Sequence, residues 1–241
     1  ASPPKRRRLL RGSTASLSGT IYPNMDGLRL PANTLPWEGV ALRPPAGQDY
    51  DLEYYDATVT IYDGFRPPLT SSAYGSGATD FILNNTNTAG SPAHDVGVLH
   101  YGGTYQPYGI EHQQAPLLAM TLGNTYFGLS MADGQMLYLD KYQHVPNASV
   151  PSVRFEVIGA PSQRLHLALF SSTTTLASRS GALVDVATDG TGHAIFDIAL
   201  PTTGPTLSYG VVVYRDQSDG GTAPATFTIS GQLQYAIRAD V

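Results

Sequence analysis

The sequence predicts an all-β protein: two tandem β-sandwich, jelly-roll-like domains that follow an N-terminal basic arm. The first reason is composition, since the 241 residues include 15 Tyr, 25 Gly and 18 Pro. Aromatic rings suit a pleated surface whereas Gly and Pro interrupt helices, so we expect very little helix. The second reason is a succession of short alternating apolar runs separated by turn residues. The third is an internal repeat, which indicates a duplicated unit.

The repeat begins with two Pro-bounded loops, LPANTLP at 30–36 and VPNASVP at 145–151. A chain of this length could form one large β domain or two of about 110 to 120 residues, and the repeat favours two. We therefore predict a basic arm and linker at 1–19, a first sandwich at 20–115 and a second at 116–241. Three further pairs of similar segments follow the loops in the same order: 40–42 with 153–155, 52–55 with 167–170, and 97–101 with 210–214.

In the first unit, six segments have the alternation and the flanking turns of β-strands. The turns are recognised by composition, for example PPAG at 44–47 and NNTN at 84–87, because these residues favour tight chain reversal. Residues 1–19 show no strand periodicity. The expected strands are 39–43, 50–55, 58–62, 80–83, 96–101 and 108–112.

The second unit has a more regular pattern. In 164–170 (RLHLALF) the Leu residues alternate with polar or small residues, which predicts a half-buried strand. Residues 216–221 (DQSDGG) are expected to form an exposed turn that closes an antiparallel hairpin. The expected strands are 117–122, 125–130, 135–142, 152–158, 164–170, 183–187, 192–198, 209–214 and 226–237.

Charge is distributed unevenly along the chain. Five of the 14 basic residues lie in the first eleven positions, so the remainder has nine basic against 19 acidic residues, a difference of minus ten. We predict that Lys5, Arg6, Arg7, Arg8 and Arg11 bind a partner, either an acidic patch on a neighbouring subunit, an anionic surface or nucleic acid. A tail without a binding role is the alternative that the sequence leaves open.

The residues do not predict an enzyme. The chain has no Cys, which excludes disulfides, thiolate zinc sites and a cysteine nucleophile. The six His residues lack ligand-pair spacing, and those inside strands, such as His100 and His166, are expected to face solvent or to be hydrogen bonded. No G-x-S-x-G elbow or nucleotide-binding glycine loop occurs. We therefore predict no catalytic residues, no metal site and no cofactor.

Calcium remains open as an alternative because carboxylates in loops of β-sandwiches can bind it. Three acidic residues in 49–53 would share one face of a strand, although the same row could be an ordinary solvent-exposed face beside tyrosines. No Asp-rich loop of the EF-hand pattern occurs. The candidate carboxylates are Asp49, Asp51, Glu53 and Asp56, then Asp185 with Asp189, and Asp216 with Asp219.

A set of short motifs runs through 152–230: VRFEV, LALFSS, ASRS, YGVVVYRD and TFTI. In this order they resemble a bacterial pre-peptidase C-terminal domain, and the first unit is similar to a divergent copy through 37–42, 49–56 and 96–101. The resemblance implies compact sandwiches, export and no catalysis, with substrate or calcium binding in some members. The chain departs from the family's usual setting because no protease domain precedes the repeats.

We expect an extracellular or cell-surface structural subunit that binds neighbouring protein subunits. Low Lys usage and abundant Thr, Ser, Gly and Tyr are typical of exported proteins. Because no signal peptide is predicted in the chain, we expect either that an export signal has been removed or that the chain is a processed piece. One alternative is a carbohydrate- or matrix-binding accessory module whose tyrosines stack on polysaccharide. Another, ranked last, is a capsid-like jelly roll with a basic arm. Of the partners named for the arm, nucleic acid is the least expected. No apolar run of about 18 residues predicts a membrane span.

Overall fold

The structure is a computed structural model that describes the chain in twelve segments. Among these residues the regular structure is almost entirely β, with two short 3-10 helices. No long apolar helix of the kind that spans a bilayer occurs in this part of the chain. The described segments are 7–8, 14–17, 25–32, 35, 37–56, 67–85, 92–101, 106–116, 119–121, 123–173, 175–219 and 224–234.

The first sandwich consists of two five-stranded sheets. Its strands are β1 (Arg7–Arg8), β2 (Thr14–Leu17), β3 (Met25–Arg29), β4 (Trp37–Arg43), β5 (Tyr50–Tyr55), β6 (Thr70–Ser72), β7 (Asp80–Asn85), β8 (Asp95–His100), β9 (Tyr108–Gln114) and, from later in the chain, β14 (Leu176–Ser178). We call β1-β3-β8-β5-β6 sheet 1 and β14-β7-β4-β9-β2 sheet 2. All pairings in them are antiparallel except that of β1 with β3, which is parallel.

The second sandwich consists of two four-stranded antiparallel sheets. Its strands are β10 (Thr125–Met131), β11 (Leu137–His144), β12 (Ser152–Gly159), β13 (His166–Phe170), β15 (Val184–Ala187), β16 (His193–Ala199), β17 (Leu207–Tyr214) and β18 (Ala225–Gln234). We call β11-β17-β13-β15 sheet 3 and β10-β18-β12-β16 sheet 4.

Both sandwiches have the same strand topology. In chain order, β2 to β9 correspond to β10 to β13 and then β15 to β18. The order β2-β9-β4-β7 then matches β10-β18-β12-β16, and β3-β8-β5-β6 matches β11-β17-β13-β15. Eight strands divided in this way between two sheets form a jelly roll. The three similar segment pairs found in the sequence lie on β4 and β12, β5 and β13, and β8 and β17.

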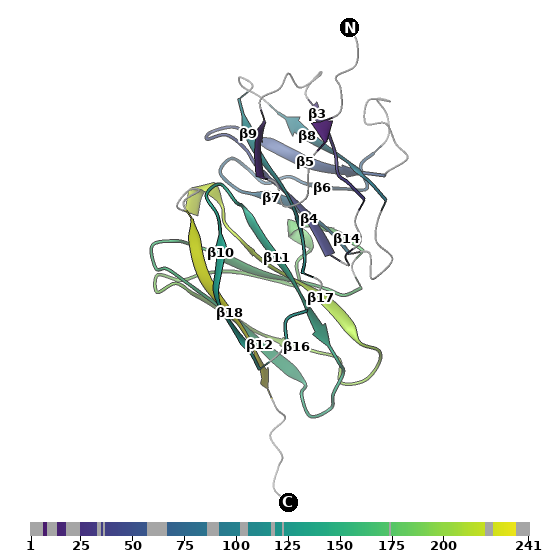
Figure 1. Cartoon of the computed structure of the whole chain (residues 1–241), viewed down its shortest axis with the longest axis vertical. Coiled ribbons are helices and arrows are strands. Elements are labelled where there is room, and N and C mark those ends of the chain that lie inside the picture. The colour runs from purple at the N-terminus through teal and green to yellow at the C-terminus, as the bar shows by residue number, and fades with distance from the viewer. Residues whose placement is uncertain are drawn as a thin grey trace, which may run out of the picture.

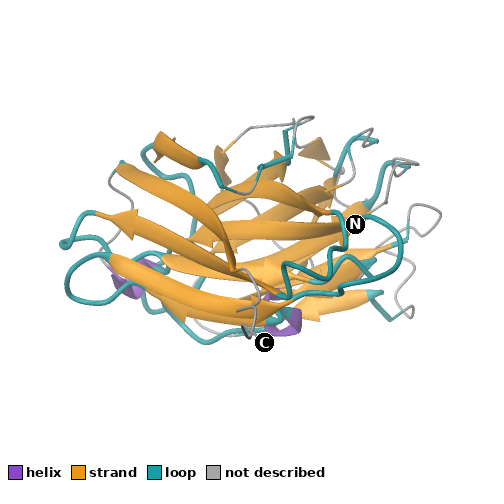
Figure 2. Ribbon diagram, turned by 90° about the horizontal axis from the view of Figure 1, so that it is seen from below, coloured by secondary structure: helices purple, strands orange, loops and turns teal. Residues whose placement is uncertain are grey.

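The four sheets stack in the order 1, 2, 3, 4 (Figure 1), and an apolar core fills each of the three spaces between them. Figure 2 shows the strands, in orange, from below. The outer two cores are those of the individual sandwiches, because apolar side chains alternate toward the partner sheet. The middle core joins the sandwiches, and sheets 2 and 3 are consequently buried on both faces. It contains Trp37, Ala41, Phe81, Leu83, Ala115, Met136, Leu137, Leu139, Ala168, Phe170, Ala177, Val212 and Tyr214.

Glycines allow sheets 2 and 3 to approach closely. Trp37 is fully buried, and a Cβ added to Gly210 of β17 would lie 2.9 Å from its ring. A Cβ added to Gly39 would lie 2.9 Å from side-chain carbons of both Leu137 and Leu83. At each position one sheet has no side chain and a side chain of the opposite sheet, Trp37 or Leu137, occupies the space. At Gly39 the neighbouring Leu83 of the same sheet also contributes.

Sheet 4 is the counterpart of sheet 2 in the second sandwich. The outer face of sheet 4 differs from the corresponding face of sheet 2, which is the face that lines the middle core. In sheet 2, Ala41 and Phe81 are opposite each other and fully buried in the middle core. At the equivalent pair in sheet 4, Arg154 donates two hydrogen bonds of 2.8 Å to Asp197, and their side chains are 43% and 50% exposed. The apolar stacking face of the first unit is thus replaced by an ion pair at the end of the stack.

Most of the strands predicted from the sequence are confirmed, within one to three residues at their ends. The predicted strand at 58–62 lies outside the described residues. The strand at 117–122 is wrong in its described part, where Met120 forms only an isolated bridge. The expected closing hairpin is also wrong: β17 belongs to sheet 3 and β18 to sheet 4, so the connection between them crosses the sandwich.

The predicted arm and linker at 1–19 contributes strands to the first sandwich. β1 pairs with β3 and β2 pairs with β9, so both lie at sheet edges. Strands of two and four residues are too short to show a periodicity, and the neighbouring strand determines their conformation. The boundary between 115 and 116 stays a prediction, and β14, which lies beyond it in sequence, pairs with β7 of the first sandwich.

Candidate functional site at the junction of the two sandwiches

Arg179 is the centre of a polar cluster at the edge of the middle core. It begins the 3-10 helix η2 (Arg179–Gly181) directly after β14. Its guanidinium donates to both carboxylate oxygens of Asp216, at 2.8 and 3.0 Å, and to the Thr79 carbonyl at 3.1 Å. It also lies 4.5 Å from the ring centroids of Tyr74 and Tyr214. Arginine interacts strongly with a carboxylate that it contacts through two hydrogen bonds and with aromatic rings that it lies against.

The same cluster connects the two sandwiches through Thr79 and Asp216. The Thr79 backbone N–H donates to Asp216 Oδ1 at 2.8 Å, and its hydroxyl donates to the Arg215 carbonyl at 2.8 Å. Asp216 was expected in an exposed turn, and that prediction is wrong because the residue is buried. The chain leaves β17 toward sheet 4, which points Asp216 into the junction, where Arg179 neutralises it.

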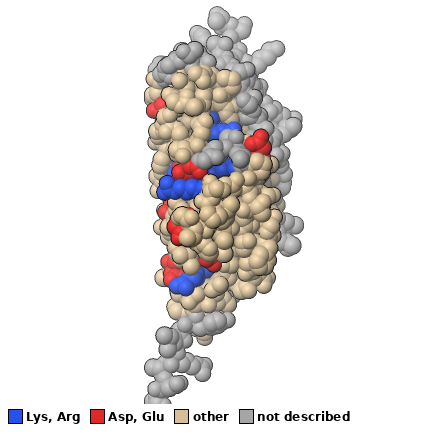
Figure 3. Space-filling view, turned by 90° about the vertical axis from the view of Figure 1, so that its left-hand side faces the viewer, with Lys and Arg blue, Asp and Glu red and all other residues tan. Residues whose placement is uncertain are grey.

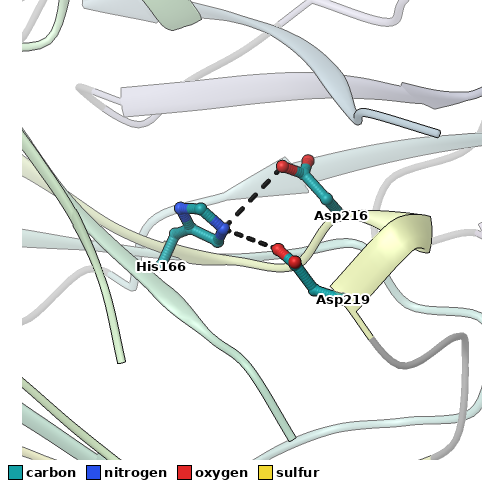
Figure 4. Close-up of side chains that lie close together, drawn as sticks. All are labelled: His166, Asp216 and Asp219. Atoms are coloured by element: carbon teal, nitrogen blue, oxygen red, sulfur yellow. Dashed lines mark hydrogen bonds and ion pairs between the residues drawn. The ribbon is translucent and has the colours of Figure 1, made fainter. Parts of the chain in front are cut away.

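His166 on β13 extends the cluster toward the surface (Figure 4). Its Nε2 lies 2.8 Å from Asp219 and 3.7 Å from Asp216, and its Nδ1 lies 3.6 Å from Asp185. The ring stacks on Tyr214 with centroids 4.6 Å apart. His166 is therefore hydrogen bonded, which is one of the two roles that the sequence predicted for it.

The carboxylates around His166 favour its protonated form. Burial by itself lowers the pKa of His166, but the interactions with Asp185, Asp219 and Asp216 outweigh burial and raise the pKa above its ordinary value. For Asp185 the opposite balance holds: burial raises the pKa, and the contacts with His166, Tyr214 and Arg179 lower it below its ordinary value. The cluster stabilises opposite charges in pairs.

A divalent cation is the first ligand to consider here, because ligand atoms of His166, Asp216 and Asp219 all lie within 4.8 Å of one another. Cations need carboxylate oxygens with free lone pairs. Both oxygens of Asp216 already accept from Arg179, and Arg164 Nη1 lies 3.4 Å from Asp219. Two guanidinium groups therefore repel a metal ion from this place.

The charges of the cluster balance without a metal. Asp185, Asp216 and Asp219 face Arg164, Arg179 and His166, whose raised pKa favours the protonated form. Three negative and three positive charges cancel. The arrangement is therefore an ion-pair network that joins the two sandwiches, and its donor groups do not fit a metal centre.

A second polar cluster lies where β9 meets the start of β11. Glu111 is buried and accepts the backbone N–H groups of Met136 and Leu137, at 2.5 and 3.3 Å. Arg43 donates to the Gly134 carbonyl at 3.2 Å, and Arg215 donates to the carbonyls of residues 132 and 135, at 2.9 Å each. Burial raises the pKa of Glu111 to about 7. This cluster also links the two sandwiches.

Asp80 is a fully buried carboxylate in β7, close to the Arg179 cluster. Its Oδ1 accepts from the Ser72 hydroxyl at 2.7 Å and from the Tyr74 N–H at 3.0 Å. Its Oδ2 is buried and has no hydrogen-bond partner among the described residues. Burial raises the pKa of Asp80 to about 7.

The structure separates the other carboxylates considered for calcium. Asp51 and Glu53 share the outer face of sheet 1, as predicted, and Asp49 and Asp51 line a shallow open pocket with Tyr74 and Tyr101. Burial and the charges of Asp49 and Glu53 raise the pKa of Asp51 to about 6. The rest do not converge: Asp56 is exposed, and Asp189 accepts from Thr191 and His193 in its own turn while Asp185 lies beside His166.

Of the predicted partner-binding residues, Arg7 and Arg8 form β1, whereas Lys5, Arg6 and Arg11 lie outside the described residues. Their role stays a prediction. The residues that build the junction were not singled out in the sequence. Arg179 lay within a quoted motif, but its partner is 37 positions away at Asp216, and no local pattern indicates such a pair.

No protein-family model and no curated protein matches the chain. Solved structures give low-scoring similarities. One is described as the triple jelly roll fold and turret assembly in an archaeal virus, at 14% identity over 90% of this chain and 58% of that one, with a TM-score of 0.21. Another is infectious bursal disease virus Gx strain, at 11% identity over 86% and 57%, with a TM-score of 0.20. A third is Bacillus subtilis oxalate decarboxylase, at 12% identity over 96% and 76%, with a TM-score of 0.19.

The chain spans less than two thirds of the length of these two viral proteins. TM-scores of this size do not establish a shared arrangement. The jelly-roll assignment therefore rests on the strand order of the two sandwiches.

Proposed function

We propose that the chain is a non-catalytic structural subunit that assembles with other protein subunits. The observation that carries this proposal is the middle core, which joins two jelly rolls into one stack with ion-pair networks at its edges. A junction buried in this way holds the two units in one relative orientation. Two units held in a fixed orientation can present their contact surfaces for neighbouring subunits at a constant distance from each other.

The described polar clusters support a non-catalytic role. The side chains around Arg179 pair with one another, and the cluster at Glu111 binds backbone groups of the loop before β11. A catalytic site needs a nucleophile or base with free access to a substrate. Asp216 and Glu111 instead accept hydrogen bonds across the junction, from Thr79 and from the start of β11.

The exposed faces of the two outer sheets are the first candidates for contact surfaces with other subunits. On the face shown in Figure 3, charged side chains are few, and blue groups lie beside red ones. The outer face of sheet 4 carries the Arg154–Asp197 pair and a contact of His193 with Glu156 at 3.0 Å, beside the exposed Ile158 and Ile195. Such faces are more polar than the interiors of obligate interfaces. We therefore assign assembly to sheet edges and to the basic arm.

A capsid-like shell subunit is the second candidate. The observation that favours it is the jelly-roll strand order in both sandwiches, since this order is frequent in shell proteins. A carbohydrate-binding accessory module has less support, because Tyr50, Tyr54, Tyr55 and Tyr108 of the first unit are buried, whereas Tyr101 is 65% exposed. The proposal also includes a relation to pre-peptidase C-terminal domains and an extracellular location.

The test is the mass in solution, measured by light scattering over a range of concentrations with and without calcium. The proposal predicts assemblies larger than one chain, and smaller ones for a chain that begins at Ser13. A monomer under every condition would contradict a structural subunit. Binding of the monomer to a polysaccharide on a glycan array would then favour the accessory module.

A further inference from the structure

The outer edge of sheet 1 carries a very short parallel pairing. Arg7 is opposite Leu28, and Arg8 is opposite Arg29. Without β1, the edge strand of this sheet would be β3. An edge strand presents unpaired backbone N–H and C=O groups, which readily accept another strand.

The second sandwich has the same feature at the equivalent edge. Met120 forms a parallel bridge with Tyr142 of β11, the counterpart of β3. Met120 follows Arg8 by 112 positions and Tyr142 follows Arg29 by 113, which matches the period of the repeat. The segment before β2 therefore pairs in parallel with β3, and the segment before β10 pairs in parallel with β11.

The two pairings differ in what holds them. Met120 donates its N–H to the Lys141 carbonyl at 2.8 Å, is 4% exposed and belongs to the core of the second sandwich. At the corresponding place in the first unit stands an arginine, opposite another arginine. Arg29 is paired with Asp95 at 2.8 Å, so the difference between the units is the missing apolar residue. A two-residue strand forms few backbone hydrogen bonds, and an arginine cannot fill an apolar site as methionine does.

A weakly held edge strand can be exchanged between copies. A strand from a second copy would make the same backbone hydrogen bonds, so exchange costs little, as in domain swapping and strand addition. Charge favours the exchange, because the arm has five basic residues and the remainder of the chain has a net charge of minus ten. Opposite charges attract the arm of one chain toward the body of another.

We propose that β1 of one copy pairs with β3 of a neighbouring copy in the assembled state. This inference rests on the proposed function, since it specifies the contact through which subunits join. The partner is a second copy of this chain, and the surface is the edge of sheet 1 along Met25–Arg29.

Engineered disulfides test the proposal directly, because the chain has no cysteine. Residues opposite each other on neighbouring strands lie within the Cα range of a disulfide. Arg8→Cys and Arg29→Cys are made in separate chains, one of them tagged, and produced together so that mixed assemblies form. After mild oxidation, non-reducing electrophoresis and mass spectrometry detect a covalent dimer with one chain of each kind. Its yield is expected to rise with protein concentration.

Arg154→Cys and Asp197→Cys are the matched control, since these residues are opposite each other on an exposed face of one chain. The double variant is expected to form a bond within the chain, and mixed single variants are expected to form no dimer of both chains. The exchange is overturned when mixed Arg8→Cys and Arg29→Cys chains give no more mixed dimer than the control. Assembly by light scattering without this dimer refutes only the exchange, whereas a monomeric protein refutes the proposed function as well.

Discussion

Substitution of Gly210 by alanine is expected to destabilise the whole molecule through the junction. A Cβ at this position would lie 2.9, 3.0 and 3.1 Å from three atoms of the Trp37 ring. Trp37 is fully buried in the middle core and cannot move aside. Overpacking of this kind costs about 1–3 kcal/mol.

The net effect is smaller because alanine also restricts the unfolded chain. That restriction stabilises the protein by about 0.5 kcal/mol, which leaves a net loss of about 1.5 kcal/mol for Gly210→Ala. For a chain of this size the loss corresponds to a decrease in Tm of roughly 3–6 °C. The assay is urea unfolding followed by tryptophan fluorescence and circular dichroism, which should report one common transition because the middle core joins both sandwiches.

A double-mutant cycle with Trp37→Phe identifies the cause, and it is followed by circular dichroism because Trp37 is the single tryptophan of the chain. The three contacted atoms belong to the six-membered ring of the indole, and phenylalanine does not place carbons there. Gly210→Ala should therefore be nearly neutral in the Trp37→Phe background, with a coupling energy of about 1.5 kcal/mol. Gly190→Ala is the matched control, since nothing lies within 4 Å of an added Cβ. Equal costs of Gly210→Ala in both backgrounds would refute the reasoning.

Three further outcomes are expected. Arg179→Met should lower the free energy of unfolding by about 3–5 kcal/mol, because it leaves Asp216 buried without its partner. Arg164→Met, at an exposed pair, should lower it by less than about 1 kcal/mol. Comparable losses of the two variants in urea unfolding would contradict this prediction. Because burial raises the pKa of Asp80 to about 7 from an ordinary 3.8, the folded state holds a proton that the unfolded state releases, so stability should fall as pH rises from 4 to 7, by up to about 4 kcal/mol. Asp80→Asn should flatten that dependence, and an unchanged slope of stability against pH would argue against the assignment. Millimolar calcium or zinc should shift Tm by less than about 1 °C, since guanidinium groups neutralise Asp216 and Asp219, and a larger shift that is lost in Asp219→Asn would establish a metal site.

Raised pKa values at the junction all change stability in the same direction with pH. Burial raises the pKa of Asp80 and of Glu111 to about 7, and the surrounding carboxylates raise that of His166 against the effect of burial. For the two carboxylates, stability is lost as pH rises from their unfolded values toward 7. For His166, the contribution of its protonated form is complete below the unfolded value and is lost as pH rises through the folded one. The connection between the sandwiches should therefore be strongest in mildly acidic solution.

Local patterns predicted the strands well where alternation extends over five or more residues. The strand at 50–55 coincides with β5, and 152–158 differs from β12 by one residue. The strands β6 and β14, of three residues each, were missed, and so was β3, whose five residues MDGLR do not alternate. Three residues hold too little alternation to be distinguished from a turn, and a neighbouring strand supplies the hydrogen bonds that define them.

The candidate site was predicted only in fragments. Asp216 and Asp219 were noted as a pair, and His166 was expected to be hydrogen bonded, but the arginine that neutralises Asp216 was not identified. The contact of Arg179 with Thr79 spans 100 positions and that with Asp216 spans 37. Contacts over such separations depend on how sheets 2 and 3 pack, and spacing along the chain carries no information about them.

The sequence by itself determined the all-β class, the duplication and most strand positions, because alternation with a period of two and turn chemistry are local properties of the chain. Only the tertiary structure decided which sheet each strand joins. β17 and β18 have the same alternation whether they pair with each other or, as here, lie in opposite sheets. Likewise, Trp37 is apolar in any arrangement, and its place between the sandwiches depends on the space that Gly210 leaves in the opposite sheet. Burial of one face can be read from a strand, but the partner that buries it is set by packing over the whole chain.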